Sequence, residues 1–146
     1  MTAAPDSKPQ ECNCAALRRA ARHVTRHYDQ HMAHIGLRSS QFSILTKLKR
    51  MGPLKINALA AAMGMDRTTL GRNILPLDRD GLIAIGKDEA DQRSKAVSLT
   101  RAGAEKQRAG LKHWQAAQTG FEKSFGVQRS AELRAMLGAV VASELA

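Results

Sequence analysis

The spacing of apolar side chains predicts long helices at both ends of the chain. From Cys12 to Ile35 they recur every three or four residues, the period of one helix face. The members of this stripe are Leu17, Ala20, Ala21, Val24, Tyr28, His31, Met32 and Ile35. The arginines between them fall on the opposite side, where we expect them to be solvated. Residues 101–124 and 129–145 show apolar positions at helical spacing and predict two further helices joined near Gly126.

The middle of the chain predicts shorter helices. Ser39 or Ser40 is suited to cap a second helix that Gly52-Pro53 ends. Between residues 56 and 83, Asn57 is suited to cap a short alanine-rich helix and Asp66 to cap the next one. Gly64 allows a sharp turn between the two. This arrangement predicts a helix-turn-helix in which one apolar side packs inward. That side consists of Leu70, Ile74 and Leu77.

A β-hairpin is predicted directly after the helix-turn-helix. Residues 82–87 and 95–100 alternate or run apolar like strands, and the loop 88–94 between them is small and polar. A strand, a charged loop and a second strand in this position form a wing. The predicted fold class is therefore α+β and mostly α. The polar residues 1–11, which include two prolines, predict a disordered tail.

Charge predicts the class of partner. The chain has 23 Lys plus Arg against 13 Asp plus Glu, a formal net charge of +10. This excess predicts a polyanionic partner, with nucleic acid ahead of an anionic membrane surface. Aromatic residues make up only 3% of the chain, which argues against proteins that bind single strands by stacking bases on aromatic rings.

Several other classes receive no support from the sequence. Two cysteines are too few for a disulfide scaffold. No apolar run approaches the roughly 18 residues of a membrane span, and the first ten residues lack the apolar core of a signal peptide. We therefore expect a soluble, cytoplasmic protein without a membrane partner. Without a Ser-His-Asp group, a Gly-rich phosphate loop or a carboxylate pair, the chain is not expected to be an enzyme.

Three stretches together resemble the MarR family of winged helix-turn-helix transcriptional regulators. They are the helix-turn-helix at 56–83, the wing at 88–100 and the start of the next helix at 100–103. Asp91-x-Arg93 followed by Leu99-Thr100-x-x-Gly103 is the most specific part, and the resemblance covers residues 12–145. It implies a homodimer whose two winged modules reach adjacent major grooves. Residues 12–35 and 102–146 would form the dimerisation region, and 36–101 the DNA-binding domain.

The second helix of the helix-turn-helix has side chains suited to a DNA major groove. Arg72 is suited to guanine, Asn73 to adenine, and threonine to a phosphate or a thymine methyl group. In the wing, Arg93 is a candidate for a minor groove, with Asp91 orienting it by a charge-assisted bond. The alternatives are a solvated helix face and surface ion pairs worth under about 1 kcal/mol. The predicted DNA-binding residues are Arg38, Ser40, Asn57, Arg67, Thr68, Thr69, Arg72, Asn73, Lys87, Asp91, Arg93 and Lys95.

Histidines and cysteines near the N-terminus leave several interpretations open. His23, His27, His31 and His34 follow one edge of the first helix, where they could pack, contact an effector or bind a metal. The resemblance places an effector pocket here, and its candidate residues are His27, His31 and Trp114. No metal or cofactor is expected. Cys12 and Cys14 are candidates for oxidation chemistry near a helix start, with inert cysteines as the alternative.

The sequence thus favours a homodimeric, sequence-specific DNA-binding regulator, with repression preferred. We expect a small aromatic or acyl-type anion to release it from a pseudo-palindromic operator, because basic and histidine groups lie beside apolar helix faces. A redox sensor acting through Cys12 and Cys14, a nonspecific basic DNA-coating protein and a winged-helix protein-interaction module are the alternatives.

Overall fold

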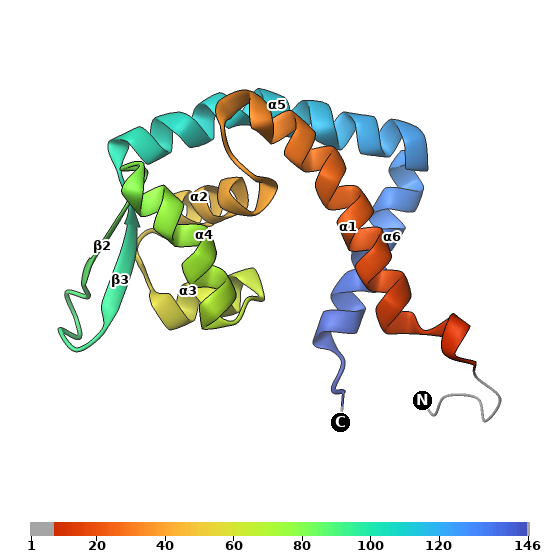
Figure 1. Cartoon of the computed structure of the whole chain (residues 1–146), viewed down its shortest axis with the longest axis horizontal. Helices are drawn as coiled ribbons and strands as arrows, with labels where there is room; N and C mark the ends of the chain where they lie inside the picture. Colours follow the sequence, from red (N-terminus) through yellow and green to blue (C-terminus); the bar gives the residue numbers. More distant parts are fainter. Residues whose placement is uncertain (1–7, 146) are drawn as a thin grey trace.

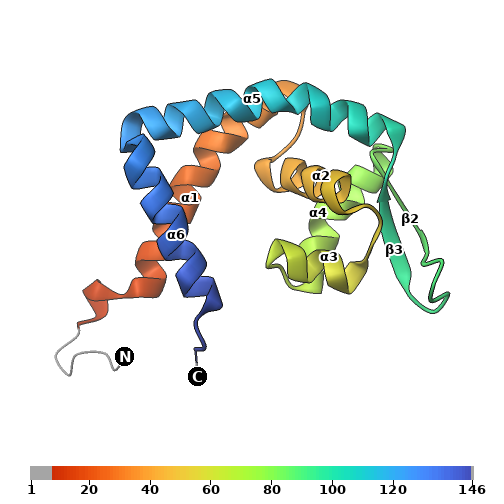
Figure 2. The same cartoon turned by 180° about the vertical axis from the view of Figure 1, so that it is seen from behind.

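The molecule is an arch of helices with two legs (Figure 1). The computed structural model describes residues 8–145. Helix α5 (Arg101–Phe125) forms the top of the arch, and the winged part lies below its N-terminal half. Helices α1 (Asn13–Met32) and α6 (Val127–Ala142) form the other leg, as the view from behind also shows (Figure 2). Of the predicted disordered tail, residues 1–7 lie outside the described part, while Pro9–Glu11 form a 3-10 turn, η1.

The winged part has the predicted helix-turn-helix and wing. After α1 and a 3-10 turn, η2 (Ala33–Ile35), come α2 (Ser39–Met51), α3 (Ile56–Met63) and α4 (Arg67–Arg79). Strands β2 (Ile83–Lys87) and β3 (Lys95–Leu99) pair antiparallel, with Ile83 opposite Leu99. A short strand that the pattern did not predict, β1 (Leu54–Lys55), pairs with β3, and the sheet order is β1-β3-β2. The α+β, mostly helical fold class is confirmed.

Helix starts follow the predicted caps only in part. Asp66 caps α4 as predicted, because its carboxylate accepts the Thr69 N–H at 2.7 Å, and Gly64 makes the preceding turn with φ of 65°. Asn57 is not a cap: it lies inside α3, whose N-cap position is Lys55.

The predicted serine caps of α2 are also wrong. Both serines lie inside the first turn of the helix, after Arg38 at the N-cap. The Gln41 side chain accepts the Arg38 N–H at 2.9 Å, and Asp29 of α1 accepts the Ser39 N–H at 2.7 Å. Helix α2 therefore starts on a bond to a distant carboxylate, which ties the winged part to α1.

One apolar core holds the winged part together. Leu70, Ile74 and Leu77 of α4 are buried, as their spacing predicted, against side chains of the other helices and the sheet. Burying one such side chain completely is worth roughly 1.5–3 kcal/mol. The other fully buried members of this core include Ile44, Leu45, Leu48, Leu59, Ile83 and Val97. This packing fixes which face of α4 points outward.

A close contact joins the wing to the start of α5. The Thr100 hydroxyl donates to the Gly81 carbonyl at 2.6 Å and accepts the Gly103 N–H at 3.0 Å. A Cβ on Gly103 would lie 1.9 Å from the Leu82 carbonyl oxygen, so only glycine fits there. The Leu99-Thr100-x-x-Gly103 pattern thus has a structural cause: it lets α5 lie directly on the backbone that follows α4.

The leg formed by α1 and α6 is less completely packed. The predicted stripe of α1 is buried at its C-terminal end, where Met32 is 1% exposed, but Leu17 near the start is 43% exposed. On α6, Leu137, Val140 and Val141 are also exposed. Within the described residues, none of the helices combines the length and apolar character that crossing a membrane requires.

We expect Gly103→Ala to lower the free energy of unfolding by about 1–3 kcal/mol, the usual range for overpacking a filled site. Gly71→Ala is the matched control, because a Cβ on Gly71 in α4 would meet nothing within 4 Å. That variant should be neutral or gain about 0.5–1 kcal/mol from better helix propensity. Urea denaturation followed by circular dichroism measures both. Equal stability of the two variants would contradict the close contact.

Candidate nucleic-acid interface

Helix α4 presents a polar face to solvent. Arg67, Thr68, Thr69 and Arg72 are all exposed, while the opposite side of the helix lies in the core. Neither arginine forms an ion pair within residues 8–145. The structure therefore brings these four predicted residues together on one free surface.

Two further predicted residues, both half-buried, bind each other between α2 and α4. The Ser40 hydroxyl of α2 donates to the Asn73 side-chain oxygen at 2.7 Å, and the Asn73 amide nitrogen donates to the Thr69 carbonyl at 2.9 Å. Contact of Asn73 with adenine stays a prediction, and it would require the side chain to exchange these partners. Arg38 is exposed at the start of α2.

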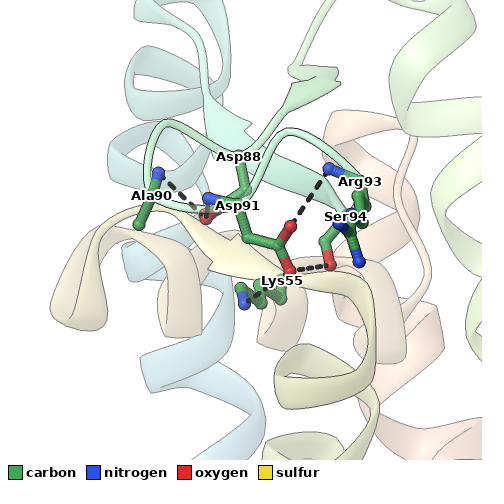
Figure 3. A network of polar contacts seen from close by, with 6 residues as sticks. All are labelled: Lys55, Asp88, Ala90, Asp91, Arg93 and Ser94. Carbon is green, nitrogen blue, oxygen red and sulfur yellow. Dashed lines mark hydrogen bonds and ion pairs between the residues drawn. The ribbon is translucent and has the colours of Figure 1, made fainter.

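The wing loop is held by its own carboxylates (Figure 3). The Asp88 carboxylate accepts the N–H groups of Ala90 and Asp91 at 3.1 and 2.8 Å. The Asp91 carboxylate accepts the Arg93 N–H and the Ser94 hydroxyl, both at 3.1 Å, and pairs with Lys55 Nζ at 3.6 Å. The expected bond between Asp91 and the Arg93 guanidinium is thus wrong. An aspartate readily binds the backbone two residues on, and here that bond shapes the turn.

Hydrogen bonds lower the pKa of two carboxylates at this surface. Bonds from the Arg93 N–H and then the Ser94 hydroxyl hold the pKa of Asp91 below its ordinary value. The Thr69 backbone N–H lowers the pKa of Asp66 in the same way. Hydrogen bonds that favour the charged form have this effect. Both turns that carry basic side chains are therefore fixed by an ionised aspartate at neutral pH.

A basic groove, here called the wing groove, runs between the wing and the first turns of α3 and α4. Its volume is about 450 Å³. It is lined by Lys55, Ile56, Asn57, Arg67, Arg93, Ser94 and Lys95. Four of the predicted DNA-binding residues lie here, and Lys87 lies opposite Lys95 in the β2–β3 ladder. Lys55 was missed, because a two-residue strand gives too little pattern to place its side chain.

The three predicted effector residues do not share one site. His27 Nε2 donates to the Ala117 carbonyl at 2.8 Å, and its ring lines a hollow of about 500 Å³ between α1 and α5. His31 Nδ1 donates to the His27 carbonyl at 3.0 Å. Trp114 instead borders two hollows at α2. The helical repeat placed the two histidines on one edge of the first helix, but it could not show which cavity each side chain faces.

Of the remaining histidines, His23 lines the hollow beside His27. His34 of η2 stacks on His113 of α5 with 5.0 Å between ring centroids, which is a packing contact between two elements. Cys12 and Cys14 are exposed and free, and Cys12 Sγ accepts the Ala15 N–H at 3.4 Å. A redox role for them stays a prediction. Among residues 8–145, no group of three or more His, Cys, Asp or Glu side chains is arranged to hold a metal.

Comparison with known proteins identifies the family. The MarR family model matches residues 37–95. The structure of the transcriptional regulator MosR from M. tuberculosis in complex with DNA is 32% identical, with 92% of this chain and 100% of that chain covered and a TM-score of 0.77. A probable transcriptional regulator from Pseudomonas aeruginosa is 26% identical, with 91% and 99% covered and a TM-score of 0.81.

A curated relative matches over a shorter stretch. YwoH of Bacillus subtilis, an uncharacterized HTH-type transcriptional regulator, is 28% identical over 85 residues. These are 58% of this chain and 61% of YwoH, so the match spans less than two thirds of that relative. All three relatives are described as transcriptional regulators rather than enzymes. The family match over the winged part and the similarity to MosR over nearly the whole chain show that this protein belongs to the MarR family of winged helix-turn-helix transcriptional regulators.

Proposed function

We propose that this regulator is a homodimeric repressor that binds a pseudo-palindromic operator and leaves it when a small aromatic or acyl-type anion binds. The observation that carries the DNA-binding part is the free polar face of α4 beside the basic wing groove. MosR, which is similar over nearly the whole chain, has been crystallised with DNA.

In this proposal, the side chains of α4 make the contacts that distinguish one DNA sequence from another. The exposed Arg72 guanidinium is suited to donate two hydrogen bonds to guanine in the major groove, and Thr68 and Thr69 to contact a thymine methyl group or a phosphate. Arg93 is exposed at the wing, where the negative potential of a narrow minor groove attracts a guanidinium.

In this proposal, a second copy of the chain covers the exposed apolar side chains of α1 and α6. Leu17, Leu137 and Val140 are 43, 39 and 45% exposed, and a mostly apolar hollow of about 540 Å³ lies between α1, α5 and α6. An apolar surface of this kind marks an interaction site. Residues 12–35 and 102–146 would therefore form the dimerisation region and 36–101 the DNA-binding domain. A two-fold dimer then matches two half-sites about one DNA turn, roughly 34 Å, apart.

The effector site in this proposal is the cleft at Trp114, where α2 meets α5. Two hollows of about 400 and 310 Å³ share Phe42, Ser43 and Trp114 as walls. Lys47 and Arg50 of α2 line the larger one and supply positive charge beside apolar side chains. This combination suits a small aromatic or acyl-type anion. A 10- to 100-fold change in DNA affinity requires only about 1.4–2.7 kcal/mol of coupling between the sites.

We expect Arg72→Ala to weaken binding to the operator by about 1–3 kcal/mol and to relax preference at one base pair, because it removes a base contact. Fluorescence anisotropy with the upstream intergenic duplex and a random duplex measures this. Arg101→Ala is the control, since Arg101 pairs with Glu105 at the start of α5. Equal affinity of the unchanged protein for both duplexes would favour nonspecific coating. Absence of binding would favour a protein-interaction module.

We expect Leu137→Glu to convert a dimer into a monomer, because it places a charge in the apolar face of α6. Sedimentation velocity measures the change in mass. Leu75→Glu is the control: Leu75 is 64% exposed but lies on α4, outside that face. An unchanged protein that sediments as a monomer at micromolar concentration would refute the dimer.

We expect benzoate or octanoate to change the emission of Trp114, the chain's single tryptophan, and to release the protein from the operator. Lys47→Gln combined with Arg50→Gln should abolish both effects, since it removes the two cations of the cleft. His27→Gln should leave both intact. If His27→Gln alone abolishes release, the ligand binds in the α1–α5 hollow instead. Calorimetry without heat from either anion would exclude this ligand class.

A further inference from the structure

The chain between α1 and α2 is fixed on the middle of α5 by two side-chain contacts (Figure 1). Ile35 of η2 packs against α5 at Gly110, where an added Cβ would lie 2.8 Å from Ile35 Cδ1. The second contact is the stack of His34 on His113, with 5.0 Å between the ring centroids and 16° between the ring planes. Gly36 then turns the chain toward α2 with φ of 72°. The stack therefore lies where the chain passes from the leg of α1 into the winged part.

The charged groups that act on His113 are all basic. They are His34 of η2, Lys112 of α5 and His31 of α1. Burial lowers the pKa of His113 most, and positive charge on these three neighbours lowers it further. His113 is half-buried, whereas His34 is exposed. A proton on the His34 ring therefore makes a proton on the His113 ring less favourable.

The acidic side chains of the elements packed around the stack are engaged elsewhere. Asp29 of α1 accepts the Ser39 N–H, and α2, which also packs on α5, contains no acidic residue. On α5, Glu105 and Glu122 lie more than two helical turns from His113, and each pairs with an arginine. Among residues 8–145, neither histidine of the stack forms an ion pair with a carboxylate. Two protonated rings would therefore repel each other without compensation.

We propose that His34 and His113 form a proton-sensitive joint between α5 and the chain that connects α1 to α2. Histidine is the side chain whose charge ordinarily changes between about pH 5 and 8. Neutral rings stack and keep the connection on α5. Protonation of both rings separates them and leaves the Ile35 contact to hold the connection, so that α2 becomes free to shift against α1.

The joint is a property of one chain, but its effect on DNA rests on the proposed function. In a homodimer, a shift of α2 against α1 changes how the two copies of α4 are placed relative to each other. We therefore expect protonation of the joint to weaken binding to an operator whose half-sites have a fixed spacing.

Nitrogen-15 NMR of the histidine rings tests whether the two rings share a charge. We expect the pKa of His113 to lie below the ordinary value of about 6.5 and to rise in His34→Phe, which keeps a ring in the stack but takes no proton. His23→Phe makes the same change at an exposed histidine of α1 and should leave the pKa of His113 unaltered. If the pKa of His113 is the same in His34→Phe as in the unchanged protein, the proposal is wrong.

The pH dependence of stability has a defined sign. The folded chain binds the His113 proton less readily than the unfolded chain, because the pKa of His113 is lowered by folding. This contribution to the free energy of unfolding is complete above about pH 6.5 and is lost as the pH falls below that value. Urea denaturation at several pH values should show a smaller loss in His34→Phe than in the unchanged protein and the full loss in His23→Phe.

Amide hydrogen exchange tests whether the joint opens. The N–H groups of Gly36 and Leu37 donate to carbonyls of η2 and α1 at 3.0 and 3.3 Å, and they report on the connection. We expect their protection factors to fall several-fold between about pH 7.5 and 5.5, the range in which histidine titrates. They should stay constant in His34→Phe and in His113→Phe, which removes the charge from the α5 side. An equal fall in both variants would overturn the joint. Thermal melting of each variant checks that the fold is intact.

Binding to DNA at constant salt separates the joint from the proposed function. We expect the ratio of affinities for the operator and a random duplex to fall about fivefold or more between these pH values, and to fall less in His34→Phe. The ratio cancels the general gain in affinity that any newly charged histidine gives toward a polyanion. A constant ratio, with ring titration and exchange as expected, would overturn the effect on DNA and leave the joint. If the protein binds no duplex, the proposed function fails, and the NMR results still decide the joint.

Discussion

The contact between the start of α5 and the backbone after α4 is the constraint on which the arrangement of this protein depends. Thr100 uses one hydroxyl to bind the Gly81 carbonyl and to cap α5 at Gly103, while the missing side chain of Gly103 lets the helix reach the Leu82 carbonyl. The end of α4, the end of strand β3 and the start of α5, the longest helix, therefore lie next to one another. Further along α5, the buried Gln107 accepts from Lys49 Nζ at 3.2 Å and donates to the Thr46 hydroxyl at 3.3 Å. Together these contacts join α5 to the wing, to the backbone after α4 and to α2.

The two legs of the arch differ in how completely a single chain buries their apolar side chains. In the winged part the apolar faces of the helices and the sheet close on one another, so its core is complete within one chain. In the other leg, α1 and α6 cross α5 but leave leucine and valine side chains in water. Polar contacts also link the helices of that leg: the Tyr28 hydroxyl of α1 donates to Gln118 of α5, and Arg134 of α6 pairs with Glu122 of α5 at 3.7 Å. Exposed apolar side chains on helices that are already joined to one another suit association with a second copy.

Features that depend on local spacing were predicted correctly from the sequence. Features that depend on contacts between residues far apart in the chain were not. Leu70, Ile74 and Leu77 face the core because helical geometry alone places them on one side, and Asp66 caps α4 because it needs only the next turn. The start of α2 was misplaced because its first N–H groups bind Gln41 and Asp29, and the Asp29 bond links two helices. The role of Asp91 was misjudged because charge pairing with Arg93 was assumed, whereas the backbone N–H lies nearer to the carboxylate. The wing groove was not foreseen because residues of β1, α3, α4, the wing loop and β3 build it together.

Aspartates that bind nearby backbone N–H groups explain how a surface with both acidic and basic residues can still attract a polyanion. Asp66, Asp88 and Asp91 turn their carboxylates toward backbone N–H groups, so they shape turns and leave most neighbouring cations free. Helix α2 contacts both this surface and the cleft at Trp114. One side of α2 carries Lys47 and Arg50 in the cleft at Trp114, and its first turn carries Ser40, which binds Asn73 of α4. Under the proposed function, a ligand that prefers a different position of α2 against α5 would displace Ser40, whose hydroxyl binds Asn73 of α4. In the proposed regulation, such a ligand would shift DNA binding only by its difference in affinity for the two positions, and the hydrogen bond between Ser40 and Asn73 would carry that difference to α4.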